Sequence, residues 1–430
     1  MEAFVTKKRQ RRTPQLDQYA EEESTEVKLA ILESLQPGMP QDVLLDALLS
    51  CEGNVDKAAA SLSGVDTTDT TPPPLKRFKS VGYQSSISST FRSPSGVEKP
   101  VVPRPLTKKG RTLHLFTPED IEAHTPCSII HNFLPASQAD ALLRELLEEA
   151  PTYWKGEFQM FDRTVLSPHT FCFYVKDEQA ADEQRKDYYY QGAEVPDVRT
   201  LRPEMRKVSL PVQDAVNSEI ERRIRDFYPG GKKLRHQGPN IWEPNCAFVN
   251  VYSGGAENVG YHADQLTYLG PRPVIGSLSL GVAREFRVRR IVPRDKDDKN
   301  ADDAAADTQG QIAIHLPHNS LLVMHAEMQE EWKHSIAPAA SIDPHPVAGN
   351  KRINITYRFY RESMHPKYTP RCKCGVPVSL KCSMKSAVNR GRYMWTCDMG
   401  YQPGQKNCGY FEWAEFDDDG EPIWPENKKR

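Results

Sequence analysis

The sequence predicts a multidomain α+β protein, and three observations favour that fold class. Apolar residues at helical spacing occupy 24–63, which predicts a small three-helix bundle. Within 115–362, helical patterns come first and short strands between Gly and Pro turns follow, as in a β sandwich or barrel. Five of the nine cysteines crowd the C-terminal part, which predicts a further compact unit at 370–416. A length of 430 residues is enough for these domains, and 34 prolines indicate long connecting segments beside them.

The N-terminal tail, 1–23, is basic and contains no apolar stretch typical of a secretory signal. Its run from Lys7 to Arg12 is typical of a nuclear import signal or of a nucleic-acid contact, and the alternative is a solvated tail. No uninterrupted apolar run approaches the roughly 18 residues that a membrane helix needs. We therefore expect an intracellular, nuclear protein that does not cross a membrane.

The segment 24–63 is expected to be an interaction module. A helical pattern ends at Pro37-Gly38, and Asn54 can cap a third helix. The stretches Leu35-Gln36-Pro37 and Gly53–Ala58 resemble a CUE ubiquitin-binding domain. The resemblance implies ubiquitin or a ubiquitinated protein as a partner, and the alternative is a helical bundle that does not contact ubiquitin.

Two segments are expected to lie outside any packed core. Thr, Ser, Pro and Gly dominate 64–114, and such a segment cannot bury enough apolar surface to offset the entropy lost on ordering, which predicts a disordered linker. The stretch 293–309 is rich in Asp and Ala and interrupts the strand pattern, so we expect a surface insertion. The end of the chain, 417–430, is a charged tail. Because the formal net charge is only −2, any nucleic-acid surface must be a local patch.

Three side chains within 115–362 are candidate metal ligands. His262 and Asp264 are two residues apart, so on a strand they share one face and can bind the same ion. His334 would complete two histidines and one carboxylate, the set that holds non-haem Fe(II) and leaves positions open for O2 and a co-substrate. A lone His-x-Asp pair is common by chance, and an ordinary hydrogen-bonded histidine is the alternative for His262.

A strand-like stretch later in the chain carries two arginines on one face. With a period of two, Arg352, Asn354, Thr356 and Arg358 point one way while apolar residues point the other. Unpaired buried charge is costly, so these arginines need an acidic partner. The carboxylates of 2-oxoglutarate would supply it, because a guanidinium binds a carboxylate through two parallel hydrogen bonds. A structural salt-bridge network is the alternative.

Six motifs occur in the order found in AlkB-family dioxygenases, which this chain resembles over 245–360 and more loosely over 115–362. They are Asn250-Val-Tyr252, His262-Ala-Asp264, Gly276–Gly281, Ser320–Met324, Trp332-Lys-His334-Ser335 and the alternating stretch Arg352–Arg358. The resemblance implies a double-stranded β-helix (jelly-roll) core with flanking helices. It also implies a role for each of eight residues: iron ligands His262, Asp264 and His334; a distal-carboxylate partner Arg352; co-substrate hydrogen-bonding residues Asn250, Tyr252 and Asn354; and Arg358 near the metal-proximal carboxylate.

The resemblance further implies oxidative demethylation of alkylated bases, with formaldehyde, succinate and CO2 as products. A base stacked in a duplex cannot reach buried iron, so the substrate is expected to be single-stranded or flipped out. Arg163, Phe173 and Tyr174 lie in a region that resembles the family's nucleotide-recognition lid, although core packing is the alternative for the aromatic residues. Leu266 stands where DNA-repairing relatives usually carry an acidic residue near the base, which leaves DNA, RNA marks and protein open as substrates.

Four C-terminal cysteines are expected to bind structural Zn(II). Cys372, Cys374, Cys397 and Cys408 supply the four thiolates of a closed tetrahedral site, and Cys382 remains as a free thiol. Together with the surrounding sequence they resemble a GRF-type zinc finger, a family associated with single-stranded nucleic acid. We expect Arg392 to contact phosphates and Tyr393 and Trp395 to stack on bases, with burial in the finger core as the alternative for the rings. A non-catalytic scaffold joining ubiquitin to nucleic acid is the remaining alternative for the whole chain.

Overall fold

The computed structural model describes residues 111–424 apart from 161–162, 196, 294–305 and 307–308, and six isolated residues nearer the N-terminus. The chain divides into two units, Met1–Lys99 and Pro100–Arg430. In the first unit the described residues are helical and form a small apolar cluster: Leu32, Leu44 and Ala58 in its centre, with Val55, Ala59 and Leu62 against them. The remainder of the expected CUE-like bundle, like the basic tail and most of the linker, lies outside the described residues.

A mixed seven-stranded sheet is the central element of the second unit. Its neighbouring strands pair antiparallel except for the edge pair β5–β8, which is parallel. In spatial order the strands are β2 (Cys127–Ile130), β14 (Ser320–Met324), β11 (Ile275–Gly281), β16 (Lys351–Arg358), β9 (Cys246–Ser253), β5 (Thr170–Val175) and β8 (Val198–Thr200).

A five-stranded sheet lies against one face of the first. In order its strands are β1 (Leu113–Leu115), β13 (Ile312–Leu316), β12 (Arg284–Arg290), β15 (Trp332–Ile336) and β10 (Val259–His262). Buried residues of both sheets pack together between them, among them Phe286, Ile314 and Leu322. The expected insertion at 293–309 joins the paired strands β12 and β13, and most of it lies outside the described residues.

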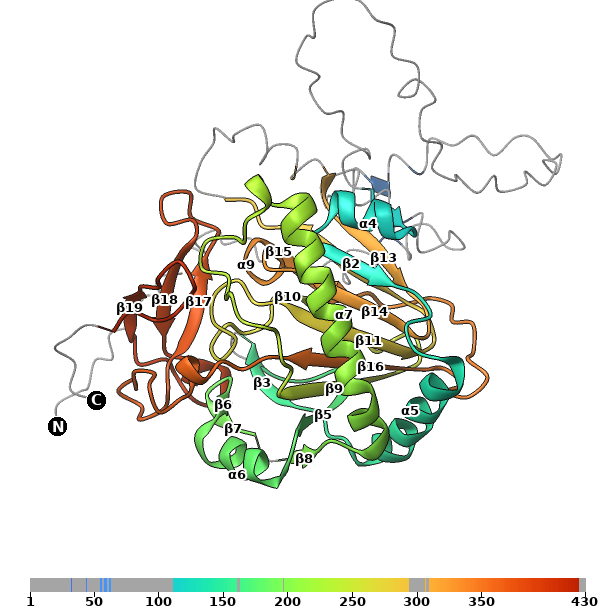
Figure 1. Ribbon diagram of the computed structural model, residues 1–430, viewed down its shortest axis with the longest axis horizontal. Helices are drawn as coiled ribbons and strands as arrows, with labels where there is room; N and C mark the ends of the chain where they lie inside the picture. The colour runs from blue at the N-terminus through green and yellow to red at the C-terminus, as the bar shows by residue number, and fades with distance from the viewer. Residues whose placement is uncertain are drawn as a thin grey trace, which may run out of the picture. The chain divides into compact units, whose positions relative to one another are not determined.

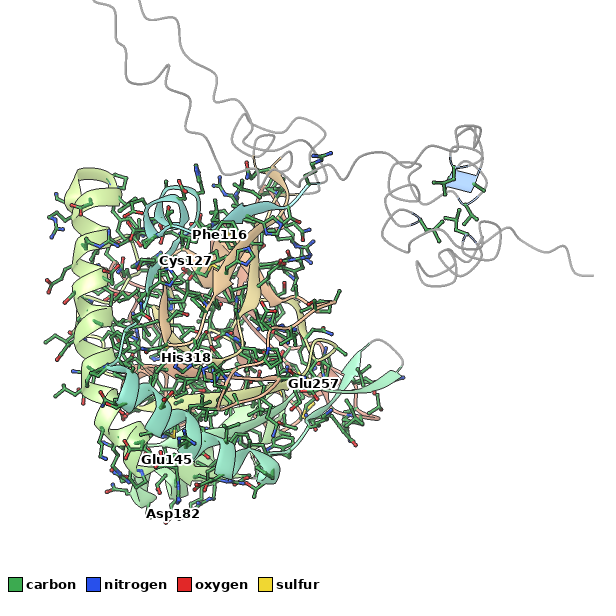
Figure 2. All side chains as sticks on the ribbon, turned by 90° about the vertical axis from the view of Figure 1, so that its right-hand side faces the viewer. Phe116, Cys127, Glu145, Asp182, Glu257 and His318 are labelled. Atoms are coloured by element: carbon green, nitrogen blue, oxygen red, sulfur yellow. The ribbon has the colours of Figure 1, made fainter. Side chains whose placement is uncertain are left out.

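Helices cover the other face of the seven-stranded sheet. Leu142 and Leu146 of α5 (Ala136–Glu149) and Val212 of α7 (Pro203–Phe227) join the sheet's outward-facing Val249 and Ile355 in one core cluster. Figure 1 shows α7 crossing the sheet, and Figure 2 shows the side chains filling the layers beside it. In the described part of the chain, no helix is both long and apolar enough to span a membrane.

Shorter elements complete this unit. The helices are α4 (Pro118–His124), α6 (Glu178–Asp187) and α9 (Met328–Glu331), with 3-10 turns at Ala150–Thr152, Pro229–Gly231, Glu362–Met364 and Met399–Tyr401. Two hairpins stand apart from the large sheets: β3 (Glu157–Met160) with β4 (Arg163–Leu166), and β6 (Tyr189–Tyr190) with β7 (Ala193–Glu194).

The C-terminal part forms a three-stranded antiparallel sheet, shown in red in Figure 1. Its strands are β17 (Ser379–Ser383), β18 (Arg392–Thr396) and β19 (Phe411–Ala414). The small core of this finger also includes Leu266 and Met364 from the preceding domain, so the two pack together. The predictions of a sheet-rich α+β core with flanking helices and of a small β-rich unit after it are confirmed; the three-helix bundle stays a prediction.

Candidate metal and co-substrate site

The structure brings the three candidate iron ligands together at the end of two neighbouring strands. His262, the last residue of β10, lies directly opposite His334 of β15, and their ring centroids are 4.3 Å apart. Asp264 follows β10, and its Oδ1 lies 3.8 Å from Nε2 of His262 and 3.6 Å from Nε2 of His334. Three donor atoms thus face one point, as a facial set of two imidazoles and a carboxylate requires.

The hydrogen bonds of His262 and Asp264 leave one metal-ligating atom of each residue free. Nδ1 of His262 lies 2.8 Å from the carbonyl oxygen of Gly260; when it donates this hydrogen bond, Nε2 is left as a ligand atom. Arg358 donates from Nε and Nη2 to Oδ2 of Asp264, at 2.9 and 2.6 Å, so Oδ1 stays free. The backbone amide of Asp264 donates to Oε1 of Gln329 at 2.8 Å.

Electrostatics keep these groups in the protonation states that metal binding needs. Burial alone would raise the pKa of Asp264, but the guanidinium of Arg358 and the two imidazoles outweigh it and lower that pKa to about 2. Burial lowers the pKa of His334 to about 3, so its imidazole is neutral near pH 7. The site therefore combines an ionised carboxylate with a neutral buried imidazole.

Arg352 lies on the same face of β16 as Arg358, yet its environment is different. It is 1% exposed, and its Nη2 donates to Oγ of Ser279 at 2.9 Å and Oδ1 of Asn354 at 3.0 Å. Nε and Nη1 have no hydrogen-bond partner among the described residues. Burial lowers the pKa of Arg352 to about 10. A buried guanidinium left in this state is costly, and a carboxylate such as one of 2-oxoglutarate satisfies it, so the residues present fit this co-substrate.

The other expected co-substrate residues surround Arg352. Asn354 lies opposite Asn250 of β9, and its Oδ1 also accepts from Oγ of Ser277 at 2.9 Å. Its side chain therefore orients Arg352 and contacts Ser277. Oδ1 of Asn250 lies 3.2 Å from Nε2 of His169. The ring of Tyr252 is 5.4 Å from the guanidinium of Arg352, so the four residues line one region.

Sequence reasoning missed several residues at this site. Ser277 and Ser279 share a face of β11 and lie opposite Thr356 and Asn354. Ser277 donates a hydrogen bond to Asn354, and Ser279 accepts one from Arg352. Their alternation within Gly276–Gly281 was a usable signal, because residues two apart on a strand point the same way. His169 stacks on Tyr252 with ring centroids 4.7 Å apart, and no sequence pattern indicated it.

Phe173 and Tyr174 were expected to contact the substrate base, with core packing as the alternative, and the structure places both side chains in the core. Phe173 is 1% exposed and packs edge-on against Phe248, while Tyr174 is fully buried. The hydroxyl of Tyr174 lies 2.9 Å from that of Tyr153 and donates to Glu149, on the side of the sheet away from the triad. Of Arg163 only the backbone position on β4 is described.

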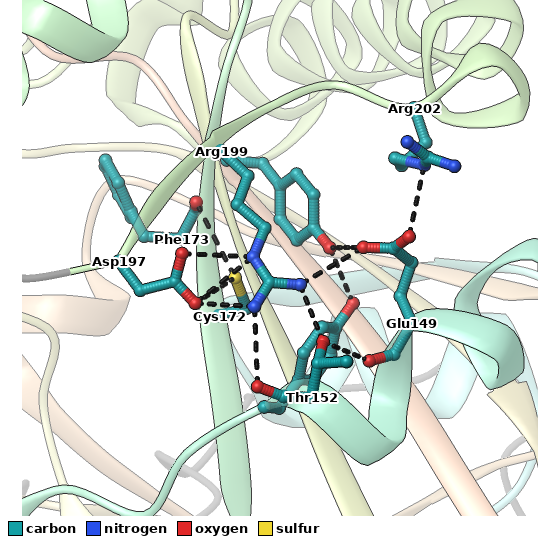
Figure 3. A network of polar contacts seen from close by, with 9 residues as sticks. Glu149, Thr152, Cys172, Phe173, Asp197, Arg199 and Arg202 are labelled. Carbon is teal, nitrogen blue, oxygen red and sulfur yellow. Dashed lines mark hydrogen bonds and ion pairs between the residues drawn. The ribbon is translucent and has the colours of Figure 1, made fainter.

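Figure 3 shows the polar network around Arg199, next to Tyr174. Arg199 of β8 binds both carboxylate oxygens of Asp197 and donates to Glu149 at 3.1 Å and to Oγ1 of Thr152 at 2.8 Å. Glu149 also forms an ion pair with Arg202 at 3.4 Å. The network ties the end of α5 to the sheet edge, which gives Tyr174 a structural role.

The four candidate zinc ligands also converge. The Sγ atoms of Cys372, Cys374, Cys397 and Cys408 lie within 4.8 Å of one another, with Cys374 and Cys397 4.0 Å apart. Tetrahedral coordination with bonds of about 2.3 Å needs sulfur atoms at close to this separation, so the residues fit Zn(II). Cys382 lies outside the group, as a free and partly buried thiol.

Two rings of the finger were expected to stack on bases, with burial in the finger core as the alternative, and the structure buries both. Tyr393 and Trp395 are 5% and 3% exposed, because alternate residues of β18 point into the finger core. Arg392 is exposed on the opposite face, and its guanidinium lies 3.7 Å over the ring of Trp413. Phe411, 53% exposed, packs edge-on against Trp413 with ring centroids 5.0 Å apart. The period-two pattern of β18 already indicated this division.

Comparisons with known proteins agree with the geometry. Residues 126–358 match the model of the 2OG-Fe(II) oxygenase superfamily, and residues 370–417 match the GRF zinc finger. "DNA oxidative demethylase ALKBH2" of Arabidopsis thaliana is 31% identical over 126 residues, which are 26% of this chain and 37% of that protein. "Alpha-ketoglutarate-dependent dioxygenase alkB homolog 3" of Bos taurus is 24% identical over 278 residues, 64% of this chain and 80% of the relative.

This chain thus spans little more than a third of the length of the Arabidopsis relative. A solved structure, "The structure of OsALKBH1", aligns with a TM-score of 0.35 and 16% identity over 55% of this chain and 99% of that one. The superfamily match covers more than half of the chain and includes all three iron-ligand candidates and Arg352. It confirms Fe(II) and 2-oxoglutarate as the cofactors, and the GRF match with its four cysteines supports Zn(II). The chain belongs to the 2OG-Fe(II) oxygenase superfamily.

Proposed function

We propose that this chain uses Fe(II), O2 and 2-oxoglutarate to demethylate alkylated bases in single-stranded or damaged DNA. One observation carries the proposal: the donor atoms of His262, Asp264 and His334 converge next to a buried Arg352 that lacks an anionic partner. The triad alone would suit many metals, whereas the unsatisfied guanidinium adds a place for a carboxylate. Support for the base-repair part comes from relatives whose names describe DNA oxidative demethylases.

Each residue of the site has a separate task in this proposal. His262, Asp264 and His334 would hold Fe(II), and Arg358 keeps Asp264 ionised and turned toward it. Arg352 would bind the distal carboxylate of 2-oxoglutarate and so fix the orientation of the keto acid. Fe(II) held there, with O2 as the oxidant and 2-oxoglutarate as the co-substrate that becomes succinate and CO2, would supply the chemistry that hydroxylates an N-methyl group, after which formaldehyde would leave.

The substrate must enter the site as an exposed base. We take the two facing sheets as a double-stranded β-helix, with the triad at its open end, where the side chains of Asp264 and His334 are only 6% and 7% exposed. A base within a duplex does not reach such atoms, so it must be unpaired or flipped out. The β3–β4 hairpin projects from the domain near Glu257 (Figure 2), and Lys155 pairs with Glu257 at 3.4 Å. We propose that Arg163 on this hairpin contacts the nucleotide.

The finger would hold the strand beside the site. Exposed Arg392 and Phe411 and the partly buried Trp413 form a surface, here called the finger platform, that combines a cation with two aromatic rings. Such surfaces bind single strands through phosphate contacts and base stacking. The CUE-like segment 24–63 and the basic run at 7–12 would add ubiquitin binding and nuclear import, which raise the local concentration of the enzyme without changing its chemistry.

RNA is a second candidate substrate, and one observation favours it. Leu266 occupies the position where a carboxylate near the base was expected, and its side chain is buried in the finger core. This position therefore contributes nothing polar to base selection. Binding competition between matched single-stranded DNA and RNA separates the two substrates.

The proposal is tested with the full-length protein, Fe(II) and 2-oxoglutarate. Single-stranded DNA and RNA oligonucleotides carrying 1-methyladenine or 3-methylcytosine are incubated with the wild type or His262→Ala, and mass spectrometry follows methyl loss. Methyl loss with the wild type alone supports the proposal, and the faster oligonucleotide identifies the nucleic acid. Succinate formation without methyl loss would keep the oxygenase but exclude these methylated oligonucleotides as substrates. If neither succinate nor methyl loss is detected, the scaffold is the function that remains.

A further inference from the structure

We propose that the zinc finger is a positioning part of the iron site. Contacts from the finger hold two segments in place: the loop that follows Asp264, and the short helix α9. Zinc bound by the four cysteines of the finger would therefore support the binding of Fe(II) and 2-oxoglutarate. The inference rests on the proposed use of the triad as the iron site.

The first contact is made by Leu266, two residues after Asp264. Its side chain is 4% exposed and packs in the finger core with Leu380 and Trp395. The next residue, Thr267, accepts a hydrogen bond at Oγ1 from the backbone amide of Leu380 at 3.3 Å. The loop that leaves the iron ligand is therefore anchored to strand β17 of the finger.

The second contact is made by Tyr393 on β18. Its hydroxyl donates to Oε1 of Glu330 at 2.9 Å, and Glu330 is 3% exposed. The same carboxylate accepts from the backbone amide of Arg272 at 2.8 Å and pairs with its Nε at 3.1 Å. Arg272 has φ of 52°, a left-handed conformation that costs a residue with a side chain roughly 1 kcal/mol or more unless its surroundings hold it. A finger residue thus completes the group that fixes the end of the loop.

The helix α9 passes this contact on to the ligands. Gln329, next to Glu330, accepts the backbone hydrogen bond of Asp264 at 2.8 Å. The strand that begins immediately after α9, at Trp332, carries His334. Movement of Glu330 therefore shifts the supports of two of the three iron ligands. Loss of a residue that hydrogen-bonds a metal ligand, as Gln329 does, typically changes metal affinity by about 10-fold to 100-fold, and Tyr393 acts from further away through Glu330.

The finger depends on its metal for stability, because its core is small and its strands are short. Zinc binding in such units is coupled to folding, so loss of the ion loosens all three strands at once. Loosening would release Leu266 and Tyr393 together. The support of the iron site therefore depends on zinc bound in the finger, although the two metal sites share no ligand.

The test compares Tyr393→Phe with Tyr410→Phe in the full-length, zinc-loaded protein. Both variants lose one phenol hydroxyl of the finger, but that of Tyr410 bonds within the finger, to Glu412 at 2.6 Å. Calorimetric titration measures the binding of Mn(II) to the iron-free protein and of 2-oxoglutarate to the Mn(II)-loaded protein, and elemental analysis measures zinc content. We expect Tyr393→Phe to bind 2-oxoglutarate or Mn(II) roughly tenfold more weakly with zinc retained, and Tyr410→Phe to match the wild type.

Hydrogen exchange gives a second readout that needs no bound iron. Amides of 264–272 and 328–331 should exchange faster in Tyr393→Phe, and faster still in Leu266→Ala, than in the wild type. Unchanged binding and exchange in both variants would overturn the inference. If the wild type itself binds no Mn(II) or 2-oxoglutarate, the proposed function fails. If the wild type binds both and the variants bind them equally well, only the inference about the finger fails.

Discussion

The two metal sites of this chain are built in opposite ways. The candidate iron site takes His262 and His334 from paired strands of a large sheet, and Arg358 and Gln329 hold Asp264 in place. The zinc group takes its four thiols from turns and strand ends of a small unit. Two large sheets hold the residues of the first site, whereas in the second the metal contributes much of the folding free energy. Removing a ligand should therefore have different consequences in each.

The largest expected effect follows loss of a zinc ligand. Cys397→Ser should abolish zinc binding and unfold β17–β19, because structural zinc contributes about 10–16 kcal/mol of apparent binding energy in small fingers. His262→Ala, the matched change at the iron site, should leave the exchange protection of β9, β11 and β16 unchanged. Hydrogen exchange with zinc analysis measures both, and a protected finger in Cys397→Ser would contradict the comparison.

The next largest effect concerns Arg352. Arg352→Met should weaken 2-oxoglutarate binding by about 2–5 kcal/mol, because the co-substrate carboxylate loses its buried partner. The unfolding free energy of the protein without co-substrate should stay the same or rise, because removing a buried charge that no anion pairs offsets the two hydrogen bonds lost from Nη2. Calorimetry and urea unfolding measure the two quantities, and a large loss of stability would contradict an unpaired guanidinium.

Arg358 provides the matched control on the same strand face. Arg358→Met breaks the ion pair with Asp264 and leaves a buried carboxylate alone, so the unfolding free energy should fall by about 3 kcal/mol. The same substitution at two positions of β16 should thus give opposite results for stability. Equal urea midpoints for the two variants would count against this contrast.

A smaller effect is the pH dependence of stability in the oxygenase domain, where His325 is buried. Burial lowers the pKa of His325 well below its usual value, with the positive Arg223 and Arg222 acting in the same direction. The unfolded chain takes up this proton below about pH 6.5, so the stabilising contribution is complete above that value and is lost as pH falls. His325 should account for about 1 kcal/mol of the stability lost between pH 6.5 and 5.5, and this share should be missing in His325→Asn, while buried His334 and His169 still contribute theirs. The finger, 370–416, contains no histidine, so this contribution is absent from it.

The sequence alone predicted most of the iron site, since a period of two fixes which residues of β16 face the cofactor. The same rule, applied to β18, would have separated exposed Arg392 from buried Tyr393 and Trp395. Phe173 and Tyr174 could not be assigned this way, because both faces of the seven-stranded sheet are covered.

The contacts between domains were beyond sequence reasoning. Gln329 and Glu330 belong to a helical turn of four residues, too short to show periodicity. Leu266 was noticed for the carboxylate that it lacks, and its packing with the finger depends on how two distant segments meet. Such contacts are set by tertiary structure, for which one sequence carries no pattern.

The most direct test of the central claim is a crystal structure of the full-length protein grown with Mn(II) and 2-oxoglutarate without O2. The account predicts Mn(II) on Nε2 of His262, Oδ1 of Asp264 and Nε2 of His334, with a carboxylate of 2-oxoglutarate on Nε and Nη1 of Arg352. A metal bound elsewhere, or an Arg352 still without an anionic partner beside ordered co-substrate, would contradict it.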